Sequence, residues 1–502
     1  MNPPALMTPP PRRQAWTALV LLAAINILNY LDRNVIFALF EPIKRDLGLS
    51  DAQLGWLGSA YILVFSLAAL PLGVLSDLKS RKGVIAGGVA LWSAFTALGG
   101  LVRNYWQLFV CRAAVGIGEA AYGPAAASMT ADYFPGKDRA TAMAILAAGI
   151  PVGGVLGLLL GGWLEGIYGW RVAFMAVGLP GFACAVLVSR LKDPTRVEEP
   201  LTFRSVMEEM ELGFRGFVRQ LLPVIVWAAI GLGAAWVASV YYGADSQVDV
   251  AVFSIAITIG VALVIWRWVR LLRADRRDET PFTSEFESAV DDLTHAGRRV
   301  LATPTLVYIF LAGAMISFGM NGLVGWGPTF ITREFNLTAG AAAAMLGKWG
   351  LLAGVLGALA GGAIADLLGR YTDRGRVITV AAGLLLGGPL AFWLLTIRDI
   401  DLFMPVFALT FFCLSWYNGP LSAVIFDVVP ARVGATVSGA YLLFIHLAGD
   451  AIAFPLVGTL SDRFGLRTAV LVLPAVAIIG GVVVLGALRT IGRDMKRVQG
   501  EG

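Results

Sequence analysis

The chain has 502 residues, of which 57% are hydrophobic and 15% are charged, and its formal net charge is +5. Soluble domains carry about 25% charged residues. With 15%, this chain has too few charged residues to cover the surface of a water-soluble globular protein, so the composition excludes that class. The positive charge falls mostly in loops and tails that would lie near anionic lipid, and it therefore does not indicate nucleic-acid binding.

Apolar stretches of about 20 residues, long enough to cross a bilayer as helices, recur along the chain. The first six spans are predicted at 15–40, 54–75, 83–102, 106–133, 141–164 and 170–191. Two more runs, at 222–242 and 250–272, are interpreted as an inserted helical hairpin. The last six spans are predicted at 305–330, 341–368, 377–397, 403–429, 435–460 and 469–488. The fold class is therefore an all-α membrane protein with about fourteen hydrophobic helices.

Short loops rich in Lys and Arg predict the cytoplasmic side of the membrane. Such loops follow every second span of the first half, at Arg81 and Lys82 and again at Lys137 and Arg139. A single inserted span would place the later basic loop at Arg374 outside, whereas zero or two inserted spans would keep it inside. The basic stretch from Arg267 to Arg277, after the second run, favours two. Both termini are expected in the cytoplasm, and the protein is expected in the plasma (inner) membrane.

The chain contains an internal repeat, which many transporters show because they arose by duplication. Motifs around Asp132, Gly169 and the Gly123-Pro124 pair recur about 295 residues later. A Gly-Asp-Arg motif after the second span recurs after the eighth, and its two copies are Gly73, Asp77, Arg81 and Gly362, Asp366, Arg370. We interpret these copies as cytoplasmic gating motifs; the alternative is that they are topology signals and helix caps.

The repeat predicts two similar halves around the hairpin. The predicted segments are a cytoplasmic tail at 1–14, a six-helix bundle at 15–191, a central linker with the hairpin at 192–300, a second six-helix bundle at 301–490 and a cytoplasmic tail at 491–502.

These motifs resemble a known family. The segment from Gly73 to Lys82 and its second copy are similar to the signature of the major facilitator superfamily, and Arg112 to Gly118 is similar to that superfamily's Arg-x-x-x-Gly-x-Gly motif. The segment Leu28-Asn-Tyr-Leu-Asp-Arg33, together with Gly116-Ile-Gly-Glu-Ala120, resembles the Spinster branch. An organic-anion symporter branch carries a similar Asp-Arg pair in its first span. The inserted hairpin departs from the usual pattern of the superfamily.

The resemblance implies a function. It implies two six-helix bundles that alternate access to a central site, and a secondary active transporter that exchanges or cotransports protons. The implied cargo is an amphipathic anionic substrate, such as a lysophospholipid or a sphingoid phosphate. The alternative is an organic-anion/proton symporter of the same superfamily.

Four charged residues in the predicted spans point to a coupling network, because charges inside the membrane are costly. Asp32 and Arg33 are adjacent in span one, so their side chains point about 100° apart. Arg112 and Glu119 are seven apart in span four, on one face and too far apart to pair with each other. We hypothesise that Glu119 or Asp32 binds the proton; the alternative is a static ion pair between two helices.

Span eleven contributes a second pair, since His446 and Asp450 are four apart on one helical face. It is interpreted as part of the coupling network, with helix packing as the alternative. A polar and aromatic lining is predicted for the substrate cavity, and its candidates are Asn29, Tyr122, Asn321, Lys348, Trp349 and Asn418. Each of them also suits helix packing or, for Lys348, a position at the membrane interface.

Enzymatic functions are not supported by any motif. We find neither a His-Glu-x-x-His motif nor a Gly-x-Ser-x-Gly elbow nor a phosphate-binding loop. Cys111, Cys184 and Cys413 lack the spacing of a metal site. We therefore expect no metal and no cofactor, with substrate, protons and lipids as partners of a monomer. A membrane-embedded lipid enzyme and a non-transporting receptor are the remote alternatives.

Overall fold

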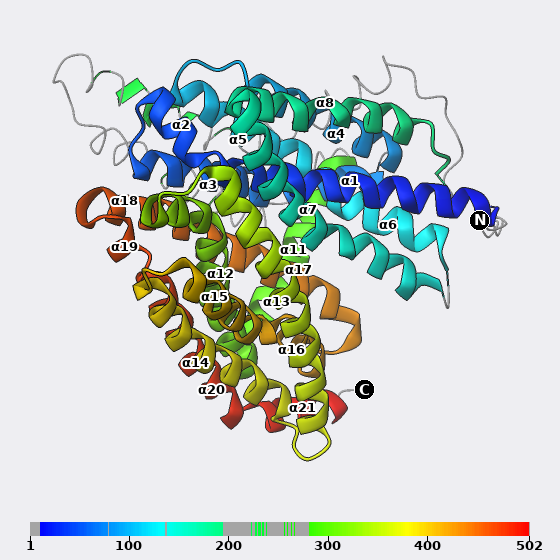
Figure 1. Ribbon diagram of the computed structural model, residues 1–502. Coiled ribbons are helices and arrows are strands. Elements are labelled where there is room, and N and C mark those ends of the chain that lie inside the picture. Colours follow the sequence, from blue (N-terminus) through cyan, green and yellow to red (C-terminus); the bar gives the residue numbers. More distant parts are fainter. Residues whose placement is uncertain are drawn as a thin grey trace. The chain divides into compact units, whose positions relative to one another are not determined.

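The computed structural model describes residues 11–78, 80–135, 138–193 and 281–500, with isolated positions between 222 and 266. Every regular element in these ranges is a helix (Figure 1). Eleven of the described segments are long and apolar enough to cross a membrane. Apart from those isolated positions, the predicted hairpin at 222–272 lies outside the described residues. The predicted total of fourteen helices includes this hairpin and therefore stays a prediction.

The amino-terminal helices follow one another with short connections. They are α1 (Arg12–Ala38), α2 (Phe40–Leu47), α3 (Asp51–Leu78), α4 (Arg81–Gly99), α5 (Tyr105–Ala120), α6 (Gly123–Tyr133), α7 (Arg139–Tyr168) and α8 (Trp170–Ser189).

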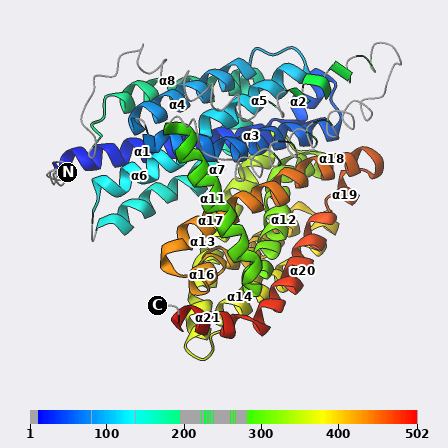
Figure 2. The same ribbon diagram turned by 180° about the vertical axis from the view of Figure 1, so that it is seen from behind.

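The carboxyl-terminal helices begin with the amphipathic α11. They are α11 (Pro281–Ala302), α12 (Pro304–Phe335), α13 (Ala339–Gly369), α14 (Gly375–Thr396), α15 (Ile400–Leu414), η2 (Ser415–Tyr417), α16 (Asn418–Asp427), α17 (Ala431–Ile445), η3 (His446–Asp450), α18 (Ala451–Phe464), α19 (Leu466–Ala469), α20 (Val472–Leu485), η4 (Gly486–Arg489) and α21 (Ile491–Gly500). Figure 2 shows α20 alongside α12 and α14, the helices with which it makes extensive contact.

A Gly-Pro pair interrupts the fourth predicted span, which the structure divides into α5 and α6. Pro124 has no N–H to bond to the carbonyl of Ala120, so the helix stops and restarts. Gly419-Pro420 has the same place in the tenth span, where the η2 turn precedes α16. With 16 and 11 residues, neither α5 nor α6 has the length of a membrane span by itself, and the described candidates are therefore eleven rather than twelve.

The described helices form two compact units. The first contains the described residues of 1–33, 64–154 and 174–291, and the second contains those of 34–63, 155–173 and 292–502. Five of the described helices contribute to both units, namely α1, α3, α7, α8 and α11. The six-helix bundles predicted at 15–191 and 301–490 follow from the internal repeat of the sequence, and they stay a prediction.

Each unit has its own apolar core. In the first, Leu22 of α1 and Trp92 of α4 are at most 1% exposed and belong to one cluster. In the second, Ile309 of α12 and Val424 of α16 are fully buried in another. The helices are therefore held by apolar packing within each unit, and the few buried charges stand out against it.

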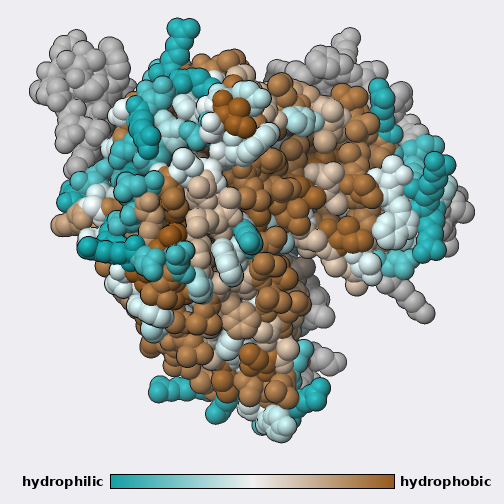
Figure 3. Space-filling view, in the orientation of Figure 1, coloured by the Kyte–Doolittle hydropathy of each residue, from teal (hydrophilic) through white to brown (hydrophobic). Residues whose placement is uncertain are grey.

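Apolar side chains also cover outer faces of the helices. Figure 3 shows hydrophobic residues over the flank formed by α13, α14 and α15, with hydrophilic residues gathered toward the ends. On α13, Leu352, Leu356 and Leu359 are 55%, 57% and 67% exposed. A continuous apolar surface of this kind suits contact with lipid chains rather than with water.

Helices α4 and α5 cross at two glycines. A Cβ at Gly118 would lie 2.6 Å from the carbonyl oxygen of Gly88 and 2.7 Å from the amide nitrogen of Trp92. We expect Gly118→Ala to cost about 1–3 kcal/mol of stability because the helices must move apart. A thermal melt of the purified protein checks this against Gly166→Ala, whose Cβ would meet no atom within 4 Å. Equal melting temperatures for the two variants would contradict the close crossing.

Candidate functional site

Two buried ion pairs join α1 to α5 in the first unit. Arg33 Nε donates to Glu119 Oε2 at 2.5 Å, and Arg112 Nη1 lies 3.3 Å from Asp32 Oδ1. Asp32, Arg112 and Glu119 are each 1% exposed. Arg112 and Glu119 of α5 thus each contact one of the two adjacent charges of α1 and do not contact each other. This agrees with their separation of seven residues, which is too long for a direct pair.

The surroundings of the two carboxylates differ. The hydroxyl of Thr96 on α4 donates to the second oxygen of Asp32, so both oxygens of Asp32 accept hydrogen bonds. The Glu119 Oε1 atom is buried and accepts none from the described residues. Because a carboxylate without a donor at one oxygen can take a proton there, Glu119 is the better placed of the two to carry one.

The guanidinium group of Arg33 also lies between aromatic rings. Its central carbon is 4.7 Å from the ring centroid of Tyr30 and 4.5 Å from that of Phe65. These faces attract a cation even when no carboxylate is near. Arg33 therefore keeps favourable contacts if Glu119 loses its charge.

Two predicted cavity residues of this unit are buried. The hydroxyl of Tyr122 donates to the backbone oxygen of Leu22 at 2.6 Å, and the side chain is 3% exposed. Asn29 is 2% exposed. The bond of Tyr122 to the backbone of α1 fits the packing alternative considered for it.

A second polar cluster surrounds Asp450 in the second unit. His446 Nδ1 lies 2.7 Å from Asp450 Oδ2, and Asn321 Nδ2 donates to Oδ1 at 2.9 Å. The hydroxyl of Ser317 on α12 donates to the same Oδ1. Asp450 is 3% exposed, whereas the His446 side chain is 30% exposed. The structure thus brings together three predicted site residues and adds Ser317.

The backbone at this cluster has an unusual form. Residues His446–Asp450 form a π-helical turn, η3, between α17 and α18. Such turns insert a residue into a helix and frequently occur at functional sites. In this turn Asp450 accepts hydrogen bonds from Ser317 and Asn321 of α12 and lies next to the His446 ring.

The other predicted cavity residues lie elsewhere. Lys348 and Trp349 on α13 are exposed, with the Lys348 amino group 5.9 Å from the indole centroid. Asn418 is exposed and donates to the carbonyl of Ser415 at 3.1 Å, a local helix-end contact. In the described part of the chain, no hydrogen bond joins these three to the Asp450 cluster.

An ion pair recurs near the two gating motifs, but in the second copy it uses Arg376 and not the predicted Arg370. Arg81 pairs with Asp132, and Arg376 pairs with Asp427 at the same sequence separation of 51 residues. Arg370, the motif counterpart of Arg81, is exposed, as is Asp366. A Cβ at Gly73 or Gly362 would meet no atom within 4 Å, and the side chain of Asp77 lies outside the described residues. Arg376 is therefore the structural equivalent of Arg81.

A charge exchange tests that equivalence. We expect Arg376→Asp to lower the transport rate about two- to fivefold, the effect of roughly 0.5–1 kcal/mol for a partly exposed pair. Arg376→Asp combined with Asp427→Arg should recover most of that rate, whereas Arg370→Asp should change it less than Arg376→Asp does. Initial rates in proteoliposomes check this, and failure of the exchange to recover any rate would argue against the pair.

A second repeated feature is a glycine turn with an arginine two residues later. Gly169 and Gly465 have φ of +82° and +80°, which glycine adopts without strain. Arg171 pairs with Asp46, and Arg467 Nε lies 3.0 Å from Glu334 Oε2. Arg171 thus binds the last turn of α2, and Arg467 binds the last turn of α12.

Comparisons with known proteins agree with this architecture. The family model described as Major Facilitator Superfamily matches residues 22–250 and 244–449. The chain is 28% identical over 454 residues to an MFS-type efflux pump of Mycolicibacterium smegmatis, covering 90% of this chain and 85% of that protein. It is 25% identical over 520 residues to protein spinster homolog 1 of Mus musculus, covering 97% and 83%.

A solved structure is similar in fold. It is a bacterial homolog of the human lysosomal transporter Spinster in an inward-facing, unoccupied conformation. The TM-score is 0.71 at 22% identity, and the match covers 96% of this chain and 98% of that one.

Proposed function

Since this chain belongs to the major facilitator superfamily, and is thus a transporter rather than an enzyme, we propose that it carries an amphipathic anionic lipid by proton-coupled alternating access. The cargo class is a lysophospholipid or a sphingoid-phosphate-like lipid. It is supported by the similarity to Spinster proteins along most of the chain.

The observation that carries proton coupling is the crossed set of ion pairs between α1 and α5. Arg33 holds Glu119, and Arg112 holds Asp32, all with little or no contact with water. Protonation of Glu119 removes the charge that holds Arg33, so proton binding and a shift of α1 against α5 are linked. The cluster around Asp450 is a polar site in the second unit, and we propose that His446 and Asp450 belong to the same coupling network.

The gating role belongs to this proposal as well. The pairs Arg81–Asp132 and Arg376–Asp427 lie next to basic loops and would close the cytoplasmic side. We propose that both termini lie in the cytoplasm and that the protein lies in the plasma (inner) membrane. Accessibility of tags at the two termini to an impermeant reagent, in intact and in permeabilised cells, tests it.

A ligand panel tests the cargo class. Purified protein is heated with lysophospholipids, sphingoid phosphates or water-soluble organic acids, since a ligand that binds the folded state raises its apparent melting temperature. We expect stabilisation by the anionic lipids, saturating with concentration, and less by a neutral lipid of the same chain length. Stabilisation by the organic acids alone would instead favour an organic-anion/proton symporter.

A further inference from the structure

A polar cavity of about 220 Å³ lies between α11 and the start of α17 in the second unit, and we call it the α11–α17 pocket. Figure 2 shows the two helices next to each other. Four residues of α11 line one wall, and three at the start of α17 line the other; they are Asp292, His295, Ala296, Arg299, Pro430, Val433 and Thr436. None of them belongs to the predicted transport site.

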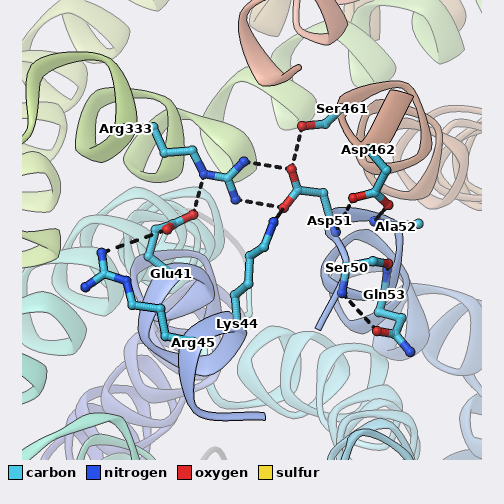
Figure 4. Close-up of polar contacts among 10 residues, drawn as sticks. All are labelled: Glu41, Lys44, Arg45, Ser50, Asp51, Ala52, Gln53, Arg333, Ser461 and Asp462. Carbon is cyan, nitrogen blue, oxygen red and sulfur yellow. Dashed lines mark hydrogen bonds and ion pairs between the residues drawn. The ribbon is translucent and has the colours of Figure 1, made fainter. Parts of the chain in front are cut away.

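Charged residues also gather at the start of α3, but there they bind one another (Figure 4). Arg333 donates from Nη1 and Nη2 to the two carboxylate oxygens of Asp51, each at 2.7 Å, and from Nε to Glu41 at 2.6 Å. Lys44 Nζ lies 2.5 Å from Asp51 Oδ1. Charges matched in this way need no added ligand. The α11–α17 pocket differs, because its charged side chains surround open space.

The polar residues of α11 in the pocket share one face of the helix. Asp292, His295 and Arg299 follow one another at intervals of three and four residues. At 1.5 Å per residue, about 4.5 Å separates Asp292 from His295 along the axis, and about 6 Å separates His295 from Arg299. The wall therefore has a carboxylate at one end and a guanidinium at the other, with the imidazole between them. The hydroxyl of Thr436 lies on the opposite wall.

This lining favours a ligand that carries both charges. The guanidinium of Arg299 suits a phosphate, which it can bind through two parallel N–H groups. His295 and Thr436 can donate further hydrogen bonds to the same phosphate. A phosphate alone would also meet the carboxylate of Asp292, a like charge. An ammonium group a few atoms from the phosphate turns that repulsion into a second ion pair.

The surroundings of the pocket point to a lipid as the source of this group. Helix α11 is amphipathic, and its Ala296 and Val300 pack in the same apolar core as Val437 of α17. Leu301 is 78% exposed, and the candidate membrane span Pro304–Phe335 begins three residues later. An exposed apolar side chain beside charged ones, at the start of a span, suits the boundary between head groups and acyl chains.

The size of the pocket agrees with a head group rather than a whole lipid. Pockets that enclose a drug-sized molecule have volumes of roughly 300–1,000 Å³, and this one has about 220 Å³. Asp292 and His295 are exposed, whereas Arg299 is partly buried. A head group can therefore enter with its charged end while the acyl tails stay outside.

We propose that the α11–α17 pocket binds the phosphoethanolamine head group of a diacyl phospholipid that is not cargo. The phosphate binds Arg299, His295 and Thr436, and the ammonium group binds Asp292. A lipid held in this way ties α11, which leads into α12, to α17. The site is independent of the proposed cargo and of proton coupling.

The test compares two lipids that differ in the ammonium group. Native mass spectrometry of the purified full-length protein gives the dissociation constant of the first bound lipid, for short-chain phosphatidylethanolamine and for phosphatidylglycerol with the same chains. We expect Arg299→Gln to weaken both lipids about tenfold, equivalent to about 1.4 kcal/mol, because both carry the phosphate. Asp292→Asn should weaken phosphatidylethanolamine about fivefold and leave phosphatidylglycerol unchanged or more tightly bound.

Matched controls come from the neighbouring positions of the same helix. Arg298→Gln and Asp291→Asn remove the same charges one residue away, from side chains that do not line the pocket. Both should stay within about twofold of the wild type for either lipid. Thr436→Val changes the opposite wall and should weaken both lipids about threefold, through the loss of one hydrogen bond.

Free phosphoethanolamine distinguishes a lipid from a soluble source of the same group. We expect it to bind at least about 100-fold more weakly than the lipid, because it has no acyl tails to bury. Equal binding of the free compound would overturn the lipid as the source.

Three other results would overturn the site itself. They are unchanged binding in Arg299→Gln and Asp292→Asn, an equal loss in the two controls, and an equal effect of Asp292→Asn on both lipids. If Arg299→Gln does not fold, the exposed Asp292 still decides the question through the difference between the two lipids. The measurement uses neither cargo nor a proton gradient, so failure of the proposed transport would leave its result standing.

Discussion

Replacing Glu119 with glutamine is expected to abolish uptake driven by a pH gradient while preserving exchange of cargo across the membrane. Glutamine has a similar shape but cannot carry a proton, so the step that links proton movement to Arg33 is lost. Exchange needs only the motion of the loaded carrier. The expected loss is at least about 100-fold in the driven rate, since one ionisable group in a coupled step is worth several kcal/mol.

The measurement is paired. Reconstituted protein is assayed for uptake driven by an inward proton gradient and for exchange of labelled against unlabelled cargo at equal pH. Glu119→Asp keeps the carboxylate and should retain part of the driven rate. Arg33 keeps its contacts with Tyr30 and Phe65 in every variant, so the fold should persist. Driven uptake at the wild-type rate in Glu119→Gln would rule this residue out as the proton carrier.

The second large effect concerns Arg112. Changing it to methionine leaves Asp32 with the hydroxyl of Thr96 and without its buried cation. Removing one partner of a buried ion pair costs about 3–5 kcal/mol because the remaining charge is uncompensated. We therefore expect Arg112→Met to unfold at a clearly lower temperature than the wild type.

A second substitution separates charge from packing. Asp32→Asn added to Arg112→Met removes the stranded charge and should recover more than half of the lost stability, because replacing both partners by uncharged groups is often close to neutral. Thermal melts of the wild type and the two variants check it. If the double variant melts no higher than Arg112→Met, the loss comes from packing around Arg112 rather than from the ion pair.

Much of the fold followed from hydropathy, because a bilayer requires long apolar helices. The spacing of Arg112 and Glu119 also indicated that both would contact another helix, and the structure pairs them with α1. The sequence shows the Gly-Pro pairs as repeated motifs but does not mark them as helix breaks. The break depends on the missing N–H of Pro124, which hydropathy does not report.

Other parts of the site could not be found from the pattern. Thr96 and Ser317 are ordinary hydroxyl residues in apolar helices, and only the packing of α4 against α1 and of α12 against η3 reveals their carboxylate partners. The π-helical turn at His446 is a shift in backbone bonding and leaves no hydropathy signal. Arg333 and Asp51, 282 residues apart, lie at the ends of predicted spans, where charges are common and their pairing is not evident.

In the proposed mechanism, protons drive the transport of an anionic lipid through this chain. The most direct measurement is the accumulation of a labelled lysophospholipid in proteoliposomes under an imposed proton gradient, compared with the same vesicles after a protonophore. We expect saturable accumulation that follows the gradient and collapses when the protonophore is added. Lipid flux that is indifferent to the gradient, or equal in protein-free vesicles, would contradict it.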